Sequence, residues 1–207
     1  MAVQLKASAS CKYSKCENIA SQTTRPVVCK ASQRAGTAVS DKQKLKDDIT
    51  AAAGALNGLD RTEEEAARIA GLLGQLESTG QLDDLDLTGS TWRLLYSTSK
   101  GSSSGKIGPF IGRVTQVFPE DSGGQYVNKI DFGLVKADLL ANYEKPQRDR
   151  INVAFEWIKF MLGPLSFKKE FTNRTPETSG GFWRLTYTDK DFRILYTNLG
   201  NVFVLVR

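Results

Sequence analysis

Few side chains in this chain could carry out chemistry. The 207-residue sequence contains no histidine, and its three cysteines, Cys11, Cys16 and Cys29, all precede residue 41. Residues 41–207 therefore contain no Ser–His or Cys–His nucleophile, no disulfide and no zinc site built from nitrogen and sulfur ligands. We expect neither a cofactor nor a metal site.

Two short motifs resemble ligand sites without fitting them. The segment GSSSGK, residues 101–106, is one spacer residue short of a phosphate-binding loop, and Ile107 stands where Ser or Thr would hold magnesium. The acidic cluster of Asp83, Asp84 and Asp86 lacks the glycine and the final glutamate of a calcium loop. We interpret the first as a flexible turn and the second as a solvated linker.

The remaining candidates for acid–base chemistry are carboxylates and tyrosines. A buried carboxylate with a raised pKa can transfer protons without histidine. The candidates are Asp131, Glu156, Tyr126 and Tyr187, and their spacing singles out no pair. The sequence therefore favours a protein that is not an enzyme. A cofactor-free enzyme of the isomerase or cyclase type is the less favoured alternative.

The basic charge of the chain is concentrated at its amino terminus. Residues 1–40 hold six Lys or Arg and one acid, and removing them from the totals of 28 bases and 23 acids leaves 22 of each. A neutral body argues against nucleic-acid binding, which requires an excess of Lys and Arg to neutralise phosphates. No apolar run approaches the ~20 residues of a membrane-spanning helix.

The first 40 residues have the composition of an organelle transit peptide. They are rich in Ser and Ala, poor in acids and without the apolar core of a secretory signal. The absence of Arg from residues 1–20 favours a plastid over a mitochondrion, and RPVVCKAS, residues 25–32, resembles a plastid processing site. We expect residues 1–40 to be a disordered transit peptide, with a plain disordered terminus as the alternative.

Residues 41–87 are predicted to form two helices and a linker. The segment NGLD, residues 57–60, predicts a break with Gly58 as the stop, and Thr62 with Glu65 predicts a capping box that starts the second helix. The expected arrangement is a helical hairpin packed on the domain. Its apolar positions recur at helical spacing: Leu45, Ile49, Ala52, Ala53 and Leu56, then Ala66, Ile69, Leu73 and Leu76.

From residue 88 onward, glycine-rich turns separate short segments rich in aromatic and β-branched residues. Such spacing is typical of an antiparallel sandwich or barrel. The last segment is expected to split near Gly200. The expected strands are 91–99, 112–118, 125–133, 135–143, 150–159, 165–171, 181–188 and 191–206.

Three of these segments repeat one phrase. WRLLYST begins at Trp92, WRLTYTD at Trp183 and FRILYTN at Phe192. Because side chains alternate along a strand, each copy predicts one face of aromatic, apolar and tyrosine side chains. The short DKD connection, residues 189–191, predicts a hairpin that brings the faces of the last two copies to the same side. Such a face would suit the inner wall of a barrel.

The order of these motifs resembles that of the plastid-lipid-associated proteins, or plastid fibrillins, across residues 41–207. That family pairs a Trp-Arg-Leu-Leu-Tyr-Ser/Thr strand with a later Asp-x-x-x-Arg-Ile segment that ends Gly-Asn-x-Phe-Val. Here these are Trp92–Thr98, Asp189–Ile194 and Gly200–Val204. The resemblance implies a mainly β fold, with a lipocalin-like antiparallel barrel of about eight strands over residues 88–207 after the helical hairpin. It also implies a plastid address, association with thylakoids or plastoglobules, and binding of apolar small molecules such as lipids, quinones or carotenoids.

A barrel of this kind gives several aromatic residues a shared role. In lipocalin-like barrels a first-strand Trp closes one end beneath a last-strand Arg, which predicts a cation–π contact between Trp92 and Arg193. Side chains can also fill an eight-stranded barrel, so a cavity and a solid core are alternatives. The candidate cavity-lining residues are Trp92, Tyr96, Phe132, Phe155, Trp157, Trp183, Tyr187, Arg193 and Phe203.

A second candidate surface is WIKFMLGPLSFKK, residues 157–169. Bulky apolar side chains flanked by lysines can enter a lipid interface, because anionic headgroups attract the bases. The alternative is two strands of ordinary core residues joined by a turn at Gly163 and Pro164. The candidate membrane contacts are Lys159, Phe160, Met161, Leu162, Lys168 and Lys169.

The expected function is that of a lipid-associated protein that makes and breaks no bond. It would bury an apolar ligand inside the barrel or dock as a peripheral protein on a lipid surface. A carrier requires a continuous cavity, whereas a structural coat requires an exposed apolar patch. The sequence leaves these two possibilities and the oligomeric state open.

Overall fold

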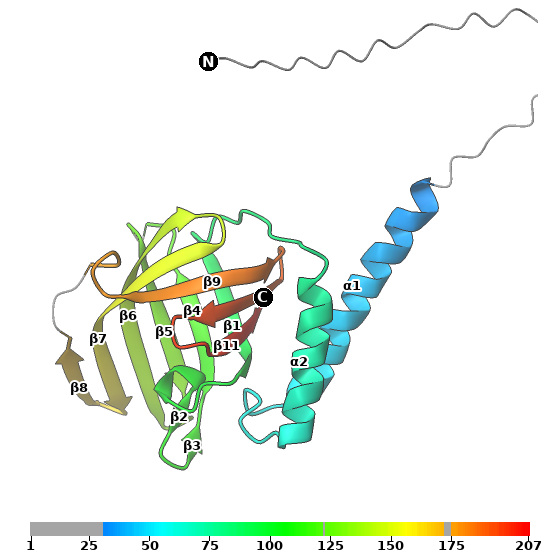
Figure 1. Ribbon diagram of the computed structural model, residues 1–207. Coiled ribbons are helices and arrows are strands. Elements are labelled where there is room, and N and C mark those ends of the chain that lie inside the picture. The colour runs from blue at the N-terminus through cyan, green and yellow to red at the C-terminus, as the bar shows by residue number, and fades with distance from the viewer. Residues whose placement is uncertain (1–30, 122, 172–174) are drawn as a thin grey trace, which may run out of the picture.

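Two helices precede a large antiparallel sheet in the computed structural model (Figure 1). The structure describes residues 31–121, 123–171 and 175–207, the side chains of residues 31–40 and Ser102 excepted. Residues 1–30 of the expected transit peptide lie outside the described residues. Residues 31–40 form the start of α1, which spans Ala31–Ala53, so this helix begins before the boundary that the sequence analysis placed at residue 41.

A glycine with a positive φ ends the first helix, and a capping box begins the second. α1 ends at Ala53 because Gly54 takes a positive φ of 69°, so the stop lies at Gly54 and not at Gly58 as predicted. α2 spans Glu63–Glu77 and has the predicted capping box. The Glu65 amide donates to Thr62 Oγ1 over 3.2 Å, and the Thr62 amide donates to Glu65 Oε2 over 2.8 Å. Among the described residues, no helix has the combination of length and apolar character that crossing a bilayer requires.

The strands follow the predicted segments closely, with two short additions and a brief 3₁₀ turn, η1, at Ser102–Ser104. The added strands are β2 (Lys106–Ile107) and β3 (Phe110–Ile111), which form a separate small hairpin. The others are β1 (Ser90–Ser97), β4 (Arg113–Phe118), β5 (Gln125–Asp131), β6 (Val135–Gln147), β7 (Arg150–Leu162), β8 (Leu165–Glu170), β9 (Gly181–Thr188), β10 (Phe192–Thr197) and β11 (Val202–Val206).

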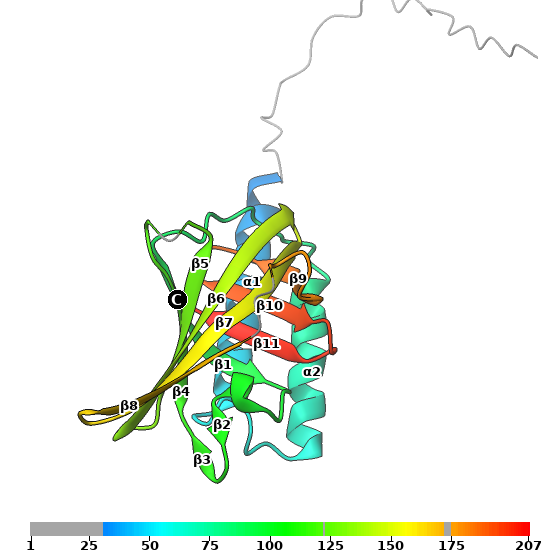
Figure 2. The ribbon, with the colours of Figure 1, turned by 90° about the vertical axis from the view of Figure 1, so that its left-hand side faces the viewer.

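The main sheet curls into a nearly closed ring. Its strand order is β6-β5-β4-β1-β11-β10-β9-β7-β8, and β6 also pairs with β7, which brings the two sides of the sheet together. The first and last strands lie side by side, because Arg93 pairs with Val206 and Ser97 with Phe203. β8 pairs only with the end of β7 and extends from the ring as a hairpin (Figures 1 and 2). The predicted antiparallel barrel of about eight strands is confirmed.

The sheet carries apolar side chains on both faces. An inner cluster fills part of the barrel and includes Trp92, Leu94, Trp183, Leu195 and Phe203. An outer cluster joins the sheet to the helices, which cover β1 and β9–β11 (Figure 2). The outer cluster contains Ile49, Ala53, Ile69, Leu73, Leu76, Leu95, Tyr96, Tyr187, Phe192, Ile194 and Val204.

The three repeated phrases do not present one common face, so that prediction is wrong. A register shift between Leu94 and Tyr96 turns Tyr96 outward, and a shift beside Thr186 does the same to Tyr187. In the third copy, Phe192, Ile194 and Tyr196 stay together as predicted, but they belong to or pack against the outer cluster, not the inner one. The repeat therefore builds two layers: its Trp residues pack inside the barrel, and its Tyr residues and Phe192 pack under the helices.

Candidate functional site

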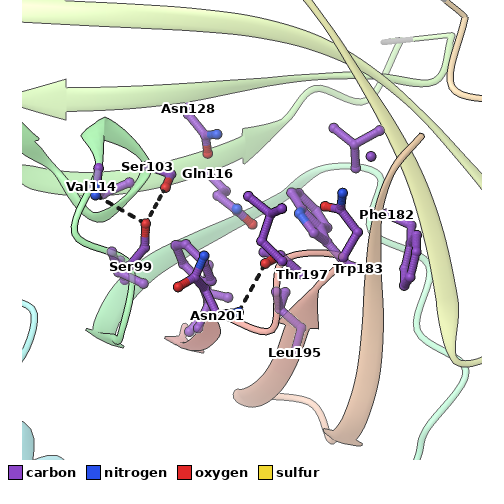
Figure 3. A pocket seen from close by; sticks show the side chains of 18 of the residues that line it. Ser99, Ser103, Val114, Gln116, Asn128, Phe182, Trp183, Leu195, Thr197 and Asn201 are labelled. Atoms are coloured by element: carbon purple, nitrogen blue, oxygen red, sulfur yellow. Dashed lines mark hydrogen bonds between the residues drawn. The ribbon is translucent and has the colours of Figure 1, made fainter. Parts of the chain in front are cut away.

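The ring contains a cavity of about 460 Å³ that opens at one end of the barrel. Leu94 of β1 and alternate residues of β4, β7, β10 and β11 line it, because successive side chains on a strand point to opposite faces. Figure 3 shows Val114, Trp183 and Leu195 among the side chains around this space. The apolar lining comprises Leu94, Val114, Val153, Phe155, Phe182, Trp183, Leu195, Leu199, Phe203 and Leu205.

Beyond this space, a plug of aromatic rings and one arginine fills the barrel. The predicted cation–π contact is confirmed, because Arg193 Cζ lies 4.6 Å from the centroid of the Trp92 ring. Arg193 also lies 5.7 Å from the Phe118 centroid, and both Arg193 and Trp92 are fully buried. The Trp92 indole donates to Ser90 Oγ over 2.9 Å. Phe118 stacks on Tyr126 with 5.2 Å between centroids, which completes the plug.

A row of two amides separates the plug from the apolar walls. Trp92 pairs with Gln116 across β1 and β4, and Gln116 pairs with Asn128 across β4 and β5. Both amides line the cavity, are at most 9% exposed, and are labelled in Figure 3. Arg193 Nη2 donates to Gln116 Oε1 over 2.7 Å. The inner end of the cavity is therefore polar, and a buried cation lies behind it.

Burial has a large effect on the pKa of this arginine. The pKa of Arg193 is lowered to about 9, chiefly by loss of hydration; Tyr126 acts in the opposite direction, and the neighbouring Arg207 contributes to the lowering. Burial likewise raises the pKa of the Tyr126 phenol. At neutral pH Arg193 is therefore a cation and Tyr126 is a neutral hydroxyl, so the plug carries a positive charge.

The structure distributes the nine candidate cavity residues over several environments. Phe155, Trp183 and Phe203 line the cavity. Trp92 and Arg193 lie in the plug behind it, and Tyr96 and Tyr187 lie on the opposite face of the sheet, under the helices. Phe132 packs against the inner cluster without lining the cavity. Trp157 lies beneath Lys168, whose Nζ is 5.0 Å from its ring centroid.

The two amides were not among the predicted site residues, although the sequence contained a signal for them. In β4, Gln116 lies in the same alternating phase as Val114 and Phe118, and in β5 Asn128 lies in phase with Tyr126 and Ile130. A polar residue in the apolar phase of a strand indicates a buried polar group. That pattern would have identified both residues before the fold was known.

The mouth of the cavity lies where β1 and β10 end and β4 and β11 begin. Two connections form its rim, the segment Ser99–Ser103 and the turn Thr197–Asn201. Ser99 Oγ lies 2.9 Å from Ser103 Oγ, and the backbone N–H of Asn201 donates to Thr197 Oγ1 over 3.2 Å (Figure 3). These bonds fix the shape of the rim.

The candidate membrane contacts fall on β7 and β8. Phe160 packs against the inner cluster and Met161 is half-buried, whereas Leu162 at the hairpin tip is 51% exposed. Lys159 pairs across the ladder with Lys168, and both Lys168 and Lys169 are exposed. Lys168 also forms an ion pair with Glu170 at 2.9 Å. The exposed apolar part of this hairpin is therefore Leu162, Leu165 and Phe167.

The candidates for acid–base chemistry do not meet. Asp131 is exposed at the end of β5, and Glu156 accepts a hydrogen bond of 2.6 Å from Asn142. Tyr126 lies in the plug and Tyr187 under the helices. Among the described residues, Lys100 is the one ionisable side chain that lines the cavity. Across the same residues, no three metal-binding side chains gather into a possible metal site.

Comparison with known proteins gives one match. The model of the PAP_fibrillin family matches residues 41–206, which are most of the chain. Neither the curated proteins nor the solved structures give a match.

Proposed function

The chain belongs to the PAP_fibrillin family of plastid lipid-associated proteins, and from this premise we propose that it binds an apolar small molecule inside its barrel. The observation that carries the proposal is the cavity of about 460 Å³. Binding sites for small molecules have volumes of roughly 300–1,000 Å³ and mostly apolar walls with a few polar groups. A lipid, quinone or carotenoid end group supplies the apolar surface that such walls exclude from water.

Binding without chemistry is the activity that this lining supports best. A catalytic cavity would present a carboxylate, phenol or nucleophile to the ligand, and the side chains around this space are apolar groups, amides and hydroxyls with Lys100 at the rim. Because the plug residues behind the amides are buried from solvent, a ligand enters and leaves through the mouth between Ser99–Ser103 and Thr197–Asn201.

Fluorescence of N-phenyl-1-naphthylamine, which brightens when it leaves water, tests binding in the cavity. The probe should bind the protein and be displaced by plastid lipid extracts. Val114→Phe, which fills the cavity, should weaken binding about tenfold or more, equivalent to about 1.4 kcal/mol. Thr115→Phe is the matched control, because Thr115 follows on the same strand and faces away from the inner cluster. Equal binding by both variants would contradict a site inside the barrel.

A second candidate function, docking on a lipid surface, is favoured by a specific asymmetry. The large exposed apolar side chains gather at the end of the barrel that holds the mouth. Phe110 is the first residue of β3, Leu134 lies between β5 and β6, and Leu199 lies between β10 and β11. Leu162 and Leu165 flank the β7–β8 turn. In an up-and-down antiparallel sheet these connections all lie at the same end.

The opposite end of the barrel has a different character. Its connections are Glu120–Gly124, Arg148–Asp149 and Asp189–Asp191, which are built from charged and small residues, with residue 122 not described. At the mouth end, Lys100, Lys136, Lys159, Lys168 and Lys169 accompany the apolar side chains. Apolar side chains flanked by lysines suit a surface that contains anionic lipids. We propose that the protein docks through this end, with its mouth towards the lipid.

A further inference from the structure

Several polar groups inside the barrel have no partner among the described residues. These are Nε and Nη1 of Arg193, the Tyr126 hydroxyl and Oδ1 of Asn128. All three residues are at least nine-tenths buried, and Asn128 lines the cavity. An unpartnered buried polar group is unfavourable, because it has lost its hydrogen bonds to water without gaining others. Oδ1 of Asn128 can only accept, so a ligand oxygen in the cavity would be bound by the Nδ2 amino group on the other side of this amide. The unpartnered groups of Arg193 and Tyr126 are fully buried and make this end of the barrel polar.

The hydrogen bond from Arg193 determines which atoms Gln116 presents to the cavity. Arg193 can only donate, so the atom of Gln116 that it contacts at 2.7 Å is the amide oxygen. The amide nitrogen therefore lies on the other side of the group, and its two N–H donors remain for a partner in the cavity. Gln116 and Asn128 are neighbours across β4 and β5, so their amides lie side by side.

The charge behind these amides favours an electron-rich partner. The ionisable groups nearest to Arg193 are the neutral Tyr126 phenol and the cationic Arg207, and no carboxylate among the described residues compensates its charge. The Trp92 ring offsets part of the cost of its burial. A buried cation without an anion attracts negative charge strongly, because the surrounding apolar medium screens it little.

We propose that the cavity binds an amphipathic ligand whose carbonyl or carboxylate oxygen accepts hydrogen bonds from Gln116 and Asn128, with its hydrocarbon part along the apolar walls. Arg193 acts from behind as a positioning residue, since it orients Gln116 and adds a favourable field without lining the cavity. This inference rests on the proposed binding function and specifies the ligand class. A plain hydrocarbon would leave the donors unpaired.

Three probes of equal chain length separate the head from the tail: dodecanoate, 2-dodecanone and dodecane. Each is titrated against the bound N-phenyl-1-naphthylamine. The expected order of affinity is dodecanoate, then 2-dodecanone, then dodecane, with about tenfold or more between the first and the last, because hydrogen bonds to charged groups are the stronger ones. Equal affinity for all three would overturn the polar-head proposal and leave the binding function intact. If none of the three probes binds and the fluorescent probe does not bind either, both the polar-head proposal and the proposed binding function are overturned.

Two variants identify the responsible amide. Asn128→Leu should abolish most of the preference for the oxygen-bearing probes while dodecane binds at least as well as before. Asn198→Leu is the matched control, because Asn198 lines the cavity at its exposed rim, and it should keep the preference. The reverse result, with the preference lost in the control and kept in Asn128→Leu, would place the head group at the mouth and overturn the proposal.

A spectroscopic measurement tests the proposal independently of the variants. The carbon-13 signal of bound dodecanoate labelled at its carboxyl reports the pKa of that group. Beside Gln116 and the Arg193 charge, the pKa should fall below its value in water, whereas in a purely apolar cavity it should rise. A raised pKa would overturn the proposal even if the variants fail to fold.

Discussion

Individual residues join the helices to the barrel through a buried ionic cluster. Lys46 Nζ on α1 lies 2.5 Å from Asp189 Oδ2 and 2.7 Å from Asp191 Oδ1 in the β9–β10 turn. The Tyr187 hydroxyl donates to Asp189 Oδ2 over 2.6 Å, and the Phe192 amide donates to Asp189 Oδ1 over 2.9 Å. The short DKD connection is therefore both the turn and the anchor of α1.

Asp189→Asn should lower the free energy of unfolding by about 3 kcal/mol at pH 7, because it removes one partner of a largely buried ion pair. Burial alone would raise the pKa of Asp189, but Lys46, Tyr187 and backbone donors outweigh it, so the pKa is lowered. A lowered pKa means that the contribution is complete above the unfolded value of about 3.9 and is lost as pH falls through the folded value.

Urea unfolding of both proteins from pH 7 to pH 2 measures this effect. The difference in the free energy of unfolding between wild type and Asp189→Asn should shrink at the acidic end of this pH range. Asp48→Asn serves as the control, because its pair with Lys44 is exposed, and it should cost less than about 1 kcal/mol. A difference that stays constant down to pH 2 would contradict the assigned role of the carboxylate.

At the scale of elements, the connection between α1 and α2 packs on the sheet because the backbone of Gly58 lies close to the ring of Tyr96. Gly58 has a φ of 75°, and a Cβ at this position would lie 2.1 Å from Cδ2 of Tyr96. The neighbouring Asn57 amide donates to the Ser104 and Gly112 carbonyls over 2.9 and 3.0 Å. The residue that the sequence analysis identified as a helix stop instead allows the helical hairpin to lie flat on Tyr96.

Gly58→Ala should therefore destabilise the protein more than a positive φ alone explains. Gly80→Ala is the matched control, since Gly80 has a φ of 66° and open space around it. The control should cost about 1 kcal/mol for its left-handed backbone, and Gly58→Ala should cost about 1–3 kcal/mol more because Tyr96 must shift. Thermal unfolding of the two variants measures the difference. Equal melting temperatures would show that the helices do not pack on Tyr96 as described.

At the scale of the whole molecule, the barrel is asymmetric along its axis. Its mouth end carries Leu134, which is 86% exposed, Leu165 at 69% and Leu199 at 80%, whereas charged turns form the other end. If the protein docks on a lipid surface as proposed, this asymmetry would give it one orientation there. Docked in this way, a ligand would pass between lipid and cavity without crossing water.

Leu134→Ser combined with Leu165→Ser should weaken binding to vesicles that contain phosphatidylglycerol by about tenfold or more, because two exposed side chains no longer enter the apolar layer. Co-sedimentation with the vesicles measures the effect. Phe171→Ser is the control, because Phe171 follows β8 away from the mouth and is 37% exposed. A loss of binding in the control alone would place the lipid contact elsewhere. Unchanged probe binding in the double variant would show that its cavity is intact.

The sequence by itself determined the helical hairpin, its capping box and most of the strands, because these depend on local spacing, turn residues and alternation. The contact between Trp92 and Arg193 was also predictable once a closed barrel was assumed. Tertiary structure decided on which face of the sheet the repeated side chains lie. Two register shifts turned Tyr96 and Tyr187 outward, and no local pattern specifies where a ladder gains an extra residue.

Tertiary structure also decided that the barrel holds a cavity and what lies at its inner end. Whether aromatic side chains fill a barrel or surround a space depends on how strands far apart in the chain pair and tilt. The row from Trp92 through Gln116 to Asn128 exists only because β1, β4 and β5 pair in one register. A shift of one residue would turn both amides to the other face of the sheet.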